Sequence, residues 1–322
     1  MSRIVELNPT SYRPHSLHCA ERLWPETNCY SDVIIELLHG LGHDPVAGLA
    51  FTLAVDYEGD QWTFFKYPDA DLLELYGLDI QELAVWRPLT EHIADQVSAG
   101  RPVLVELDSY YLPDTAGSAY KLAHVKSTVS VNEIDIERHY LGYFHNASYF
   151  SLEGADFTDV FQLGGLAHER MLPPYVELVK LRTPLRGDQT LVACSTDLLR
   201  KHLAQVPLAN PFVVFKAVLD RDLDWLMTAD MASFHTYSFA NLRQYGACYE
   251  LASTYLGWLS ANGVDGLDDA SAAFLRIAEA AKNLQMQLAR AMARKRILDT
   301  APILRMGEDW QQAVDVLRAR FA

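Results

Sequence analysis

The sequence has no long apolar run and no excess of positive charge. No stretch of its 322 residues approaches the ~20 apolar residues that a membrane-spanning helix needs, and the first residues lack the apolar core of a secretory signal. Asp and Glu total 42 against 27 Lys and Arg, and the resulting net charge of −15 argues against general nucleic-acid binding. We therefore expect neither a membrane protein nor a nucleic-acid-binding protein.

Cysteine is scarce and widely spaced. The four cysteines stand at positions 19, 29, 194 and 248 and include no Cys-x-x-Cys pair, so neither a zinc ribbon nor a dense disulfide framework is indicated. This distribution favours a reducing compartment. The sequence accordingly predicts a cytoplasmic protein.

Two histidine clusters have the spacing of partial metal sites. His15, His18 and Cys19 lie close together, but no second cluster supplies the fourth ligand that a tetrahedral site requires. His39 and His43 are four residues apart, yet glycines interrupt the helix that would align them. We therefore expect no metal and no bound cofactor.

What the sequence does contain is the composition of a folded protein. Half of the residues are hydrophobic and 21% are charged, and neither internal repeats nor low-complexity segments occur. The length is sufficient for two domains. A Pro- and Gly-containing stretch at 182–188 separates a first half of mixed character from a second half of helical character. We predict an α+β protein, with an α/β domain at 1–185 and a mostly α-helical domain at 186–322.

The coarse pattern predicts the order of elements. Strands are expected at 49–56, 61–66, 102–113 and 175–181, short helices at 69–76 and 88–98, and an antiparallel hairpin from 124–135 and 140–147. Longer helical periodicity follows at 196–203, 212–218, 238–259 and 268–298.

Cys29 stands at the predicted start of an apolar helix. Asn28 is of the type that caps helices, and the apolar residues that follow recur at helical spacing until two glycines end the pattern. A thiol in the first helical turn faces unpaired N–H groups and the positive end of the helix dipole, both of which favour the thiolate. Cys29 is therefore our candidate nucleophile, although free cysteines also pack simply as small buried side chains.

The predicted hairpin brings possible partners for this cysteine together. His124 begins one strand, whereas His145 and Asn146 end its neighbour, so the three lie at the same end of the pair. An imidazole oriented by an amide or carboxylate is the usual general base for a cysteine. We predict Cys29, His124 and Asn146 as the catalytic residues. His145 remains the alternative to Asn146, because a one-residue register shift exchanges the two faces of a strand.

These residues carry a resemblance to papain-like cysteine enzymes, in which a cysteine at a helix N-terminus precedes a histidine and an amide or carboxylate on paired strands. The chain more closely resembles an uncharacterised bacterial family whose members often accompany carrier proteins and stand-alone amino acid:carrier-protein ligases. The motifs that match stand at 26–30, 51–56, 59–65, 110–115, 141–147 and 237–245. A weaker similarity links it to butirosin-type acyltransferases, through Asn28-Cys29, the Asp-x-Tyr-Tyr-Leu-Pro segment at 108–113, and a histidine that opens the next strand.

The resemblance implies transfer of an aminoacyl group from the phosphopantetheine arm of a carrier protein. Leu23 stands where the papain pattern has its oxyanion-hole glutamine, and His145-Asn146 where related peptidases have Asp-Pro. Asn28 or Gln61 would therefore supply the second oxyanion donor. Asp108 and Tyr110 are candidates for binding the amino group or the acceptor, although Asp before aromatic residues is also common in turns.

Positive charge gathers near the end of the last long predicted helix. Arg290, Arg294 and Lys295 lie in a segment without acidic residues between Lys282 and Leu298. Carrier proteins are typically acidic, so this segment could attract one. Cations also stabilise helix C-termini without any partner, and that alternative stays open.

Together these features predict cysteine-dependent aminoacyl or acyl transfer from a carrier-protein thioester, through a covalent acyl-enzyme, to an acceptor. The expected partner is an aminoacylated carrier protein and, indirectly, the ligase that charges it. A cysteine peptidase or amidase is the alternative among enzymes. A non-catalytic carrier-protein binding module is the alternative among other classes.

Overall fold

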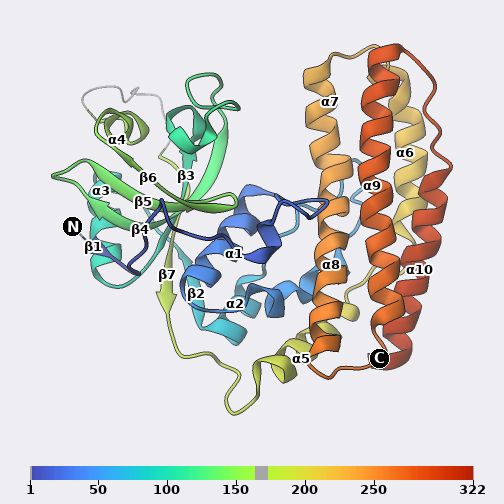
Figure 1. Ribbon diagram of the computed structural model, residues 1–322, viewed down its shortest axis with the longest axis horizontal. Helices are drawn as coiled ribbons and strands as arrows, with labels where there is room; N and C mark the ends of the chain where they lie inside the picture. The colour runs from blue at the N-terminus through green and yellow to red at the C-terminus, as the bar shows by residue number, and fades with distance from the viewer. Residues whose placement is uncertain (1, 164–172, 322) are drawn as a thin grey trace. The chain divides into compact units, whose positions relative to one another are not determined.

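A computed structural model describes residues 2–163 and 173–321. The chain is an α+β protein that divides into two compact units (Figure 1). Unit 1 comprises residues 1–19, 28–45 and 68–187, and unit 2 comprises 20–27, 46–67 and 188–322. Unit 2 is thus not only the C-terminal half, because two short segments of the N-terminal half belong to it.

Unit 1 is built on one antiparallel sheet with the strand order β2-β7-β3-β4-β5-β6, and β1 pairs with β4 outside this path. The strands are β1 (Ser2–Arg3), β2 (Leu78–Glu82), β3 (Val103–Asp108), β4 (Lys126–Asp135), β5 (Tyr140–His145), β6 (Ser148–Glu153) and β7 (Val176–Leu181). The predicted hairpin is confirmed as β4 and β5, in which Val129 lies opposite His145.

Helices cover both faces of this sheet. Ile93 and Val97 of α3 (Leu89–Ser98), together with Phe157 of α4 (Ala155–Val160), pack into one apolar core with Val131 and Tyr143. The next residue, Phe144, points to the other face, because side chains alternate along a strand. On that face α1 (Cys29–Gly40) approaches so closely that a Cβ atom at Gly40 would lie 2.5 Å from the Phe144 ring.

Unit 2 is helical. Its helices are α5 (Leu191–Leu203), α6 (Pro211–Leu226), α7 (Met231–Ser238), α8 (Gln244–Ala261), α9 (Asp268–Arg294) and α10 (Pro302–Phe321). The long helix α9 packs against both α8 and α10 (Figure 1). Among the residues that the structure describes, no helix is both long and apolar enough to cross a membrane.

The predictions of strands at 49–56 and 61–66 are wrong. Residues Pro45–Ala54 form a 3-10 helix, and only an isolated bridge between Tyr57 and Trp62 marks the second segment. The first segment is apolar on every side, with Leu49, Ala50 and Leu53 all buried. Such a run lacks the alternation that distinguishes a half-buried strand from a buried helix.

Gly77 ends α2 (Asp69–Tyr76) in a left-handed conformation, with φ of 75°. A Cβ atom there would lie 2.0 Å from the backbone oxygen of Arg182, whose N–H donates to the Gly77 carbonyl. We expect Gly77→Ala to lower the free energy of unfolding by about 3 kcal/mol or more, because backbone strain and a backbone clash combine.

The matched control for this substitution is Gly42→Ala. Gly42 has a φ of 81° but no neighbour within 4 Å of a Cβ atom. It should cost only the ~1–2 kcal/mol of a left-handed backbone. Denaturant unfolding of both variants measures the difference, and equal losses would contradict the steric argument.

Candidate active site

Cys29 is the first residue of α1. The preceding Asn28 has an extended backbone, and its side-chain oxygen accepts the N–H of Ser31 at 3.0 Å, so the predicted cap is present. The thiol is half-buried and its Sγ lies 3.9 Å from Oγ1 of Thr128 on β4. Sequence and structure thus agree in placing this thiol in the first turn of a helix that packs on the sheet.

The other cysteines differ in accessibility. Cys194 and Cys248 are completely buried in unit 2. Burial raises the pKa of the Cys248 thiol well above its ordinary value. Only Cys19 shares the half-buried state of Cys29. Cys19 is therefore the natural control for experiments on Cys29.

His124 is paired with Asp108 at the end of β3. The two side chains meet at 2.6 Å, from Nδ1 to Oδ2, and the ring of Tyr110 stacks on the imidazole at 4.3 Å between centroids. Asp108 also accepts the N–H of Tyr110 at 3.0 Å. The imidazole is 67% exposed, so its Nε2 edge is accessible while Asp108 and Tyr110 fix its orientation.

The pair lies on the same sheet face as the thiol. In the pairing of β3 with β4, Asp108 is opposite Lys126 and Glu106 is opposite Thr128. Positions two apart project to one face, so Asp108 and Thr128 both face the side that α1 covers. Cys29 contacts Thr128, which lies opposite Glu106 on β3. Asp108 is two residues further along β3, a displacement of about 7 Å.

Asn146 is placed differently from this pair. It is the first residue of the two-residue turn between β5 and β6, and its φ is 45°. Asn is among the residues that adopt this conformation most readily, so the turn alone accounts for an asparagine here and no catalytic role is needed to explain it. Within the described part of the chain, Asp108 and not Asn146 is the hydrogen-bond partner of His124. A role for Asn146 stays a prediction.

His145 faces away from Cys29. It lies opposite Val129, on the side of the sheet that α3 and α4 cover. Its Nε2 is 2.6 Å from Ser127 Oγ and its Nδ1 is 2.6 Å from Asp114 Oδ2. This order of groups is that of a serine hydrolase triad, but all three side chains are buried. Because burial excludes a substrate from Ser127, we interpret the chain of hydrogen bonds as structural.

Asp114 is a residue that the sequence analysis did not single out. Its second oxygen accepts the Tyr143 hydroxyl at 2.5 Å. Burial and the neighbouring carboxylate raise the pKa of the Tyr143 phenol. The signal in the sequence was the motif at 110–115, which places this aspartate after a strand.

The remaining predicted site residues are divided between the units. Asn28 is buried and uses its side-chain oxygen for the helix cap. Gln61 belongs to unit 2, where it is exposed beside the Tyr57–Trp62 bridge. Their proposed function as oxyanion donors stays a prediction, as does ligand binding by Tyr110.

The predicted basic segment lies at the C-terminal end of α9. Arg290 and Arg294 are exposed and border a small hollow of about 220 Å³ with Ile297, which is 99% exposed. Within the described residues neither arginine forms an ion pair. Lys295 follows in a left-handed conformation, and its Nζ donates to the carbonyl of Met227 at 2.5 Å.

A buried ionic cluster occupies the same helix as Cys29. Glu36 of α1 accepts His18 Nδ1 and the Tyr12 hydroxyl, each at 2.5 Å, and the His15 N–H at 3.0 Å. His18 Nε2 also lies 3.3 Å from Asp32. Burial alone lowers the pKa of His18, but its hydrogen bonds to Asp32 and Glu36 outweigh this effect and raise it to about 9.

This cluster accounts for one of the histidines that suggested a metal. Within the described residues, no group of three or more His, Cys, Asp or Glu side chains is arranged to hold a metal ion. His18 instead acts as the cation for two carboxylates. The residues at 15–19 thus tie the N-terminal segment to α1.

The fold and site define an α+β protein with a cysteine at a helix N-terminus and a His–Asp pair on the adjoining sheet. The chain belongs to the DUF1839 family. The model of the DUF1839 N-terminal domain matches residues 13–181, and that of the DUF1839 C-terminal domain matches residues 188–319. No curated protein matches the chain. Membership of an uncharacterised family confirms that part of the expectation from the motifs, whereas the papain-like fold and the association with carrier-protein ligases stay predictions.

Proposed function

We propose that the protein is a papain-like cysteine acyltransferase that takes an aminoacyl group from a carrier-protein thioester. The observation that carries this proposal is the placement of Cys29 in the first turn of α1, facing the sheet side that holds the His124–Asp108 pair. A nucleophile at a helix N-terminus and an oriented imidazole are the two parts that covalent catalysis by cysteine requires.

In the first step the Cys29 thiolate attacks the thioester carbonyl, and the carbon–sulfur bond to the phosphopantetheine arm breaks. His124 takes the thiol proton and returns it to the departing phosphopantetheine sulfur. In the second step an acceptor group attacks the acyl-enzyme, with His124 as its base, and releases Cys29. The backbone N–H of Cys29, at the start of α1, is suited to the oxyanion of both steps.

A thioester donor suits this site better than an amide. Exchange between two thioesters is nearly isoenergetic, so the leaving group needs little activation. An amine leaving group must receive a proton as it departs. The imidazole of His124 is 67% exposed to solvent and is therefore poorly suited to donate that proton efficiently. Hydrolysis of the acyl-enzyme by water would release free amino acid, whereas transfer would place the amino acid on an acceptor.

The carrier is expected to dock through charge. Arg290 and Arg294 provide exposed cations on α9 that no described acid neutralises, although the whole chain carries −15. Acidic carriers favour such local patches, and the effect acts mainly on the association rate and its salt dependence.

We expect His124→Ala to slow acylation by about 10²–10⁴-fold, because the general base is lost. Asp108→Asn should also slow it, since it removes the carboxylate that orients the ring and stabilises its charge. The rate at which a charged carrier loses its aminoacyl group measures both effects. His235→Ala, which removes an exposed histidine of α7, is the control and should have no effect.

Asn146→Gly separates the two possible orienting residues. Glycine keeps the left-handed backbone of the β5–β6 turn but removes the amide. We expect near-normal acylation from this variant. A loss as large as that of Asp108→Asn would reverse the assignment and favour Asn146. Unchanged acylation by His124→Ala would remove the basis of the proposed mechanism.

A further inference from the structure

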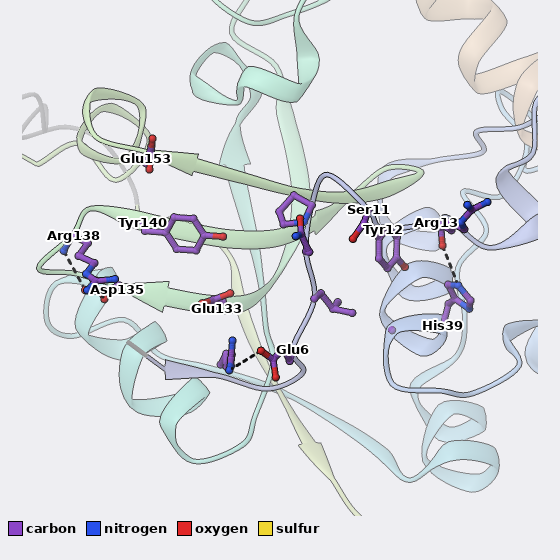
Figure 2. Close-up of a pocket in the computed structure, with 15 residues that line it drawn as sticks. Glu6, Ser11, Tyr12, Arg13, His39, Glu133, Asp135, Arg138, Tyr140 and Glu153 are labelled. Carbon is purple, nitrogen blue, oxygen red and sulfur yellow. Dashed lines mark hydrogen bonds and ion pairs between the residues drawn. The ribbon is translucent and has the colours of Figure 1, made fainter.

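A cavity in unit 1 lies away from Cys29. Its volume is about 940 Å³, and it is open to the surface between the N-terminal segment, the C-terminal end of α1 and the ends of β4, β5 and β6 (Figure 2). His39 and Gly40 border it at the last turn of α1, whereas Cys29 is the first residue of that 12-residue helix. At 1.5 Å per residue, about 16 Å of helix separates this cavity from the thiol.

A buried carboxyl group lines the cavity. Glu133 of β4 is only 3% exposed, and its side chain forms no hydrogen bond or ion pair with a described residue. Burial raises the pKa of this carboxyl group. The charge of Arg3 opposes this shift in part, although Arg3 itself pairs with Glu6. A buried acid without a hydrogen bond or ion pair costs folding free energy, part of which a cationic ligand would recover.

Glu133 borders the cavity from β4. Its cross-strand neighbour is Gly142, where a Cβ atom would lie 2.3 Å from the Tyr149 hydroxyl and 3.2 Å from the Glu133 Cβ, so the space for a ligand is the cavity itself and not the place above Gly142. In Figure 2 the side chains of Glu133, Tyr140 and Glu6 come from three different segments and border the same space. The aromatic face of Tyr140 can contribute a cation–π contact.

The cavity lining has an excess of negative charge. It contains four carboxylates, at Glu6, Glu133, Asp135 and Glu153, and three arginines, at 3, 13 and 138. Arg3 pairs with Glu6 at 3.2 Å and Arg138 with Asp135 at 3.8 Å. These two pairs leave Glu133 and Glu153 with Arg13 as the remaining arginine, so the lining keeps one negative charge in excess.

We propose that this cavity binds a small molecule through a primary ammonium group, which Glu133 receives. The ammonium would donate to the Glu133 carboxylate beneath the ring of Tyr140, and the remainder of the ligand would extend along the cavity toward Glu153. This site does not depend on acyl transfer, and its failure would leave the proposal for Cys29 unaffected.

The test is calorimetric titration of the full chain with n-butylamine, with n-butanol as the uncharged probe of the same shape. We expect the amine to bind and butanol not to bind. Glu133→Gln should weaken amine binding by about tenfold or more, as expected for a lost charge-assisted contact. Glu137→Gln, at an exposed position in the turn between β4 and β5 and outside the cavity lining, is the matched control and should leave amine binding unchanged.

A structural role for Glu133 would give a different result. If Glu133 serves to bind a ligand, its buried charge destabilises the ligand-free protein, and Glu133→Gln should raise the unfolding midpoint. If Glu133 serves only in packing, the same substitution should lower the midpoint. Should Glu133→Gln fail to fold, Tyr140→Leu replaces it and is expected to weaken amine binding severalfold. Absence of amine binding by the wild type, equal binding of butanol, or wild-type affinity in Glu133→Gln would overturn the proposal.

Discussion

Cys29→Ala should abolish transfer of the aminoacyl group, with a loss of about 10³-fold or more in the rate at which a charged carrier is discharged. The residue holds the only half-buried thiol at a helix N-terminus within the described chain. Alanine is a good helix former and leaves the Asn28 cap intact, so the fold should survive. Discharge is followed by the release of labelled amino acid or its appearance on the acceptor.

Cys19→Ala is the matched control, because Cys19 is the other half-buried thiol of unit 1. It should retain full activity. Iodoacetamide should modify the wild type first at Cys29, since the thiolate is the reactive form. If Cys29→Ala discharges carriers at the wild-type rate, or Cys19→Ala is the inactive variant, Cys29 is not the nucleophile.

Loss of the buried carboxylate at Glu36 should give the largest effect on stability. Glu36→Ala removes the acceptor of Tyr12, His15 and His18 at once. Breaking a buried ion pair in this way costs about 3–5 kcal/mol. Denaturant unfolding measures the loss. Glu26→Ala is the control, because Glu26 precedes the same helix but its side chain is 55% exposed, and we expect a change within about 0.5 kcal/mol.

The same cluster predicts how stability depends on pH. The pKa of His18 is about 9 in the folded state, above the ordinary imidazole value of 6.5 that applies in the unfolded chain. Below pH 6.5 both states hold the proton, and the full stabilisation is present. As pH rises toward 9, the unfolded state has lost the proton while the folded state keeps it, so the free energy of unfolding falls by on the order of 3 kcal/mol.

Glu36→Gln should reduce this dependence, because the neutral amide no longer raises the pKa of His18 and only Asp32 remains to do so. The comparison therefore separates the cluster from other groups that titrate in the same range. A wild-type stability that stays constant or increases between about pH 6.5 and about pH 9 would contradict the assignment of a protonated, buried His18.

Much of unit 1 was predictable because its signals are local. The cap at Asn28, the hairpin of β4 and β5 and the helix at 69–76 each follow from a few neighbouring residues. The strand predicted at 49–56 is wrong because this apolar segment is buried and belongs to the 3-10 helix Pro45–Ala54. The assignment of 20–27 and 46–67 to unit 2 rests on contacts distant in sequence, which no local pattern contains.

The candidate site was likewise predictable where its signals are local and not where its contacts join residues distant in sequence. The position of Cys29 at the start of a helix could be inferred from spacing. His124 was expected to begin a strand, but β4 starts two residues later, at Lys126. The partner of His124 could not be inferred, because Asp108 reaches it through the register of β3 with β4 and through a connecting loop. Likewise, the contact of Asp114 with His145 joins residues 31 positions apart that no periodicity relates.

The most direct test of the account is intact-protein mass spectrometry after the full chain is mixed with a carrier protein charged with candidate amino acids. The proposed acyl-enzyme mechanism predicts an aminoacyl increment on the wild type, mapped by peptide digestion to Cys29 and absent from Cys29→Ala. An increment that persists in Cys29→Ala would contradict it. So would the absence of any increment on the wild type, with the carrier thioester left intact for every amino acid tested.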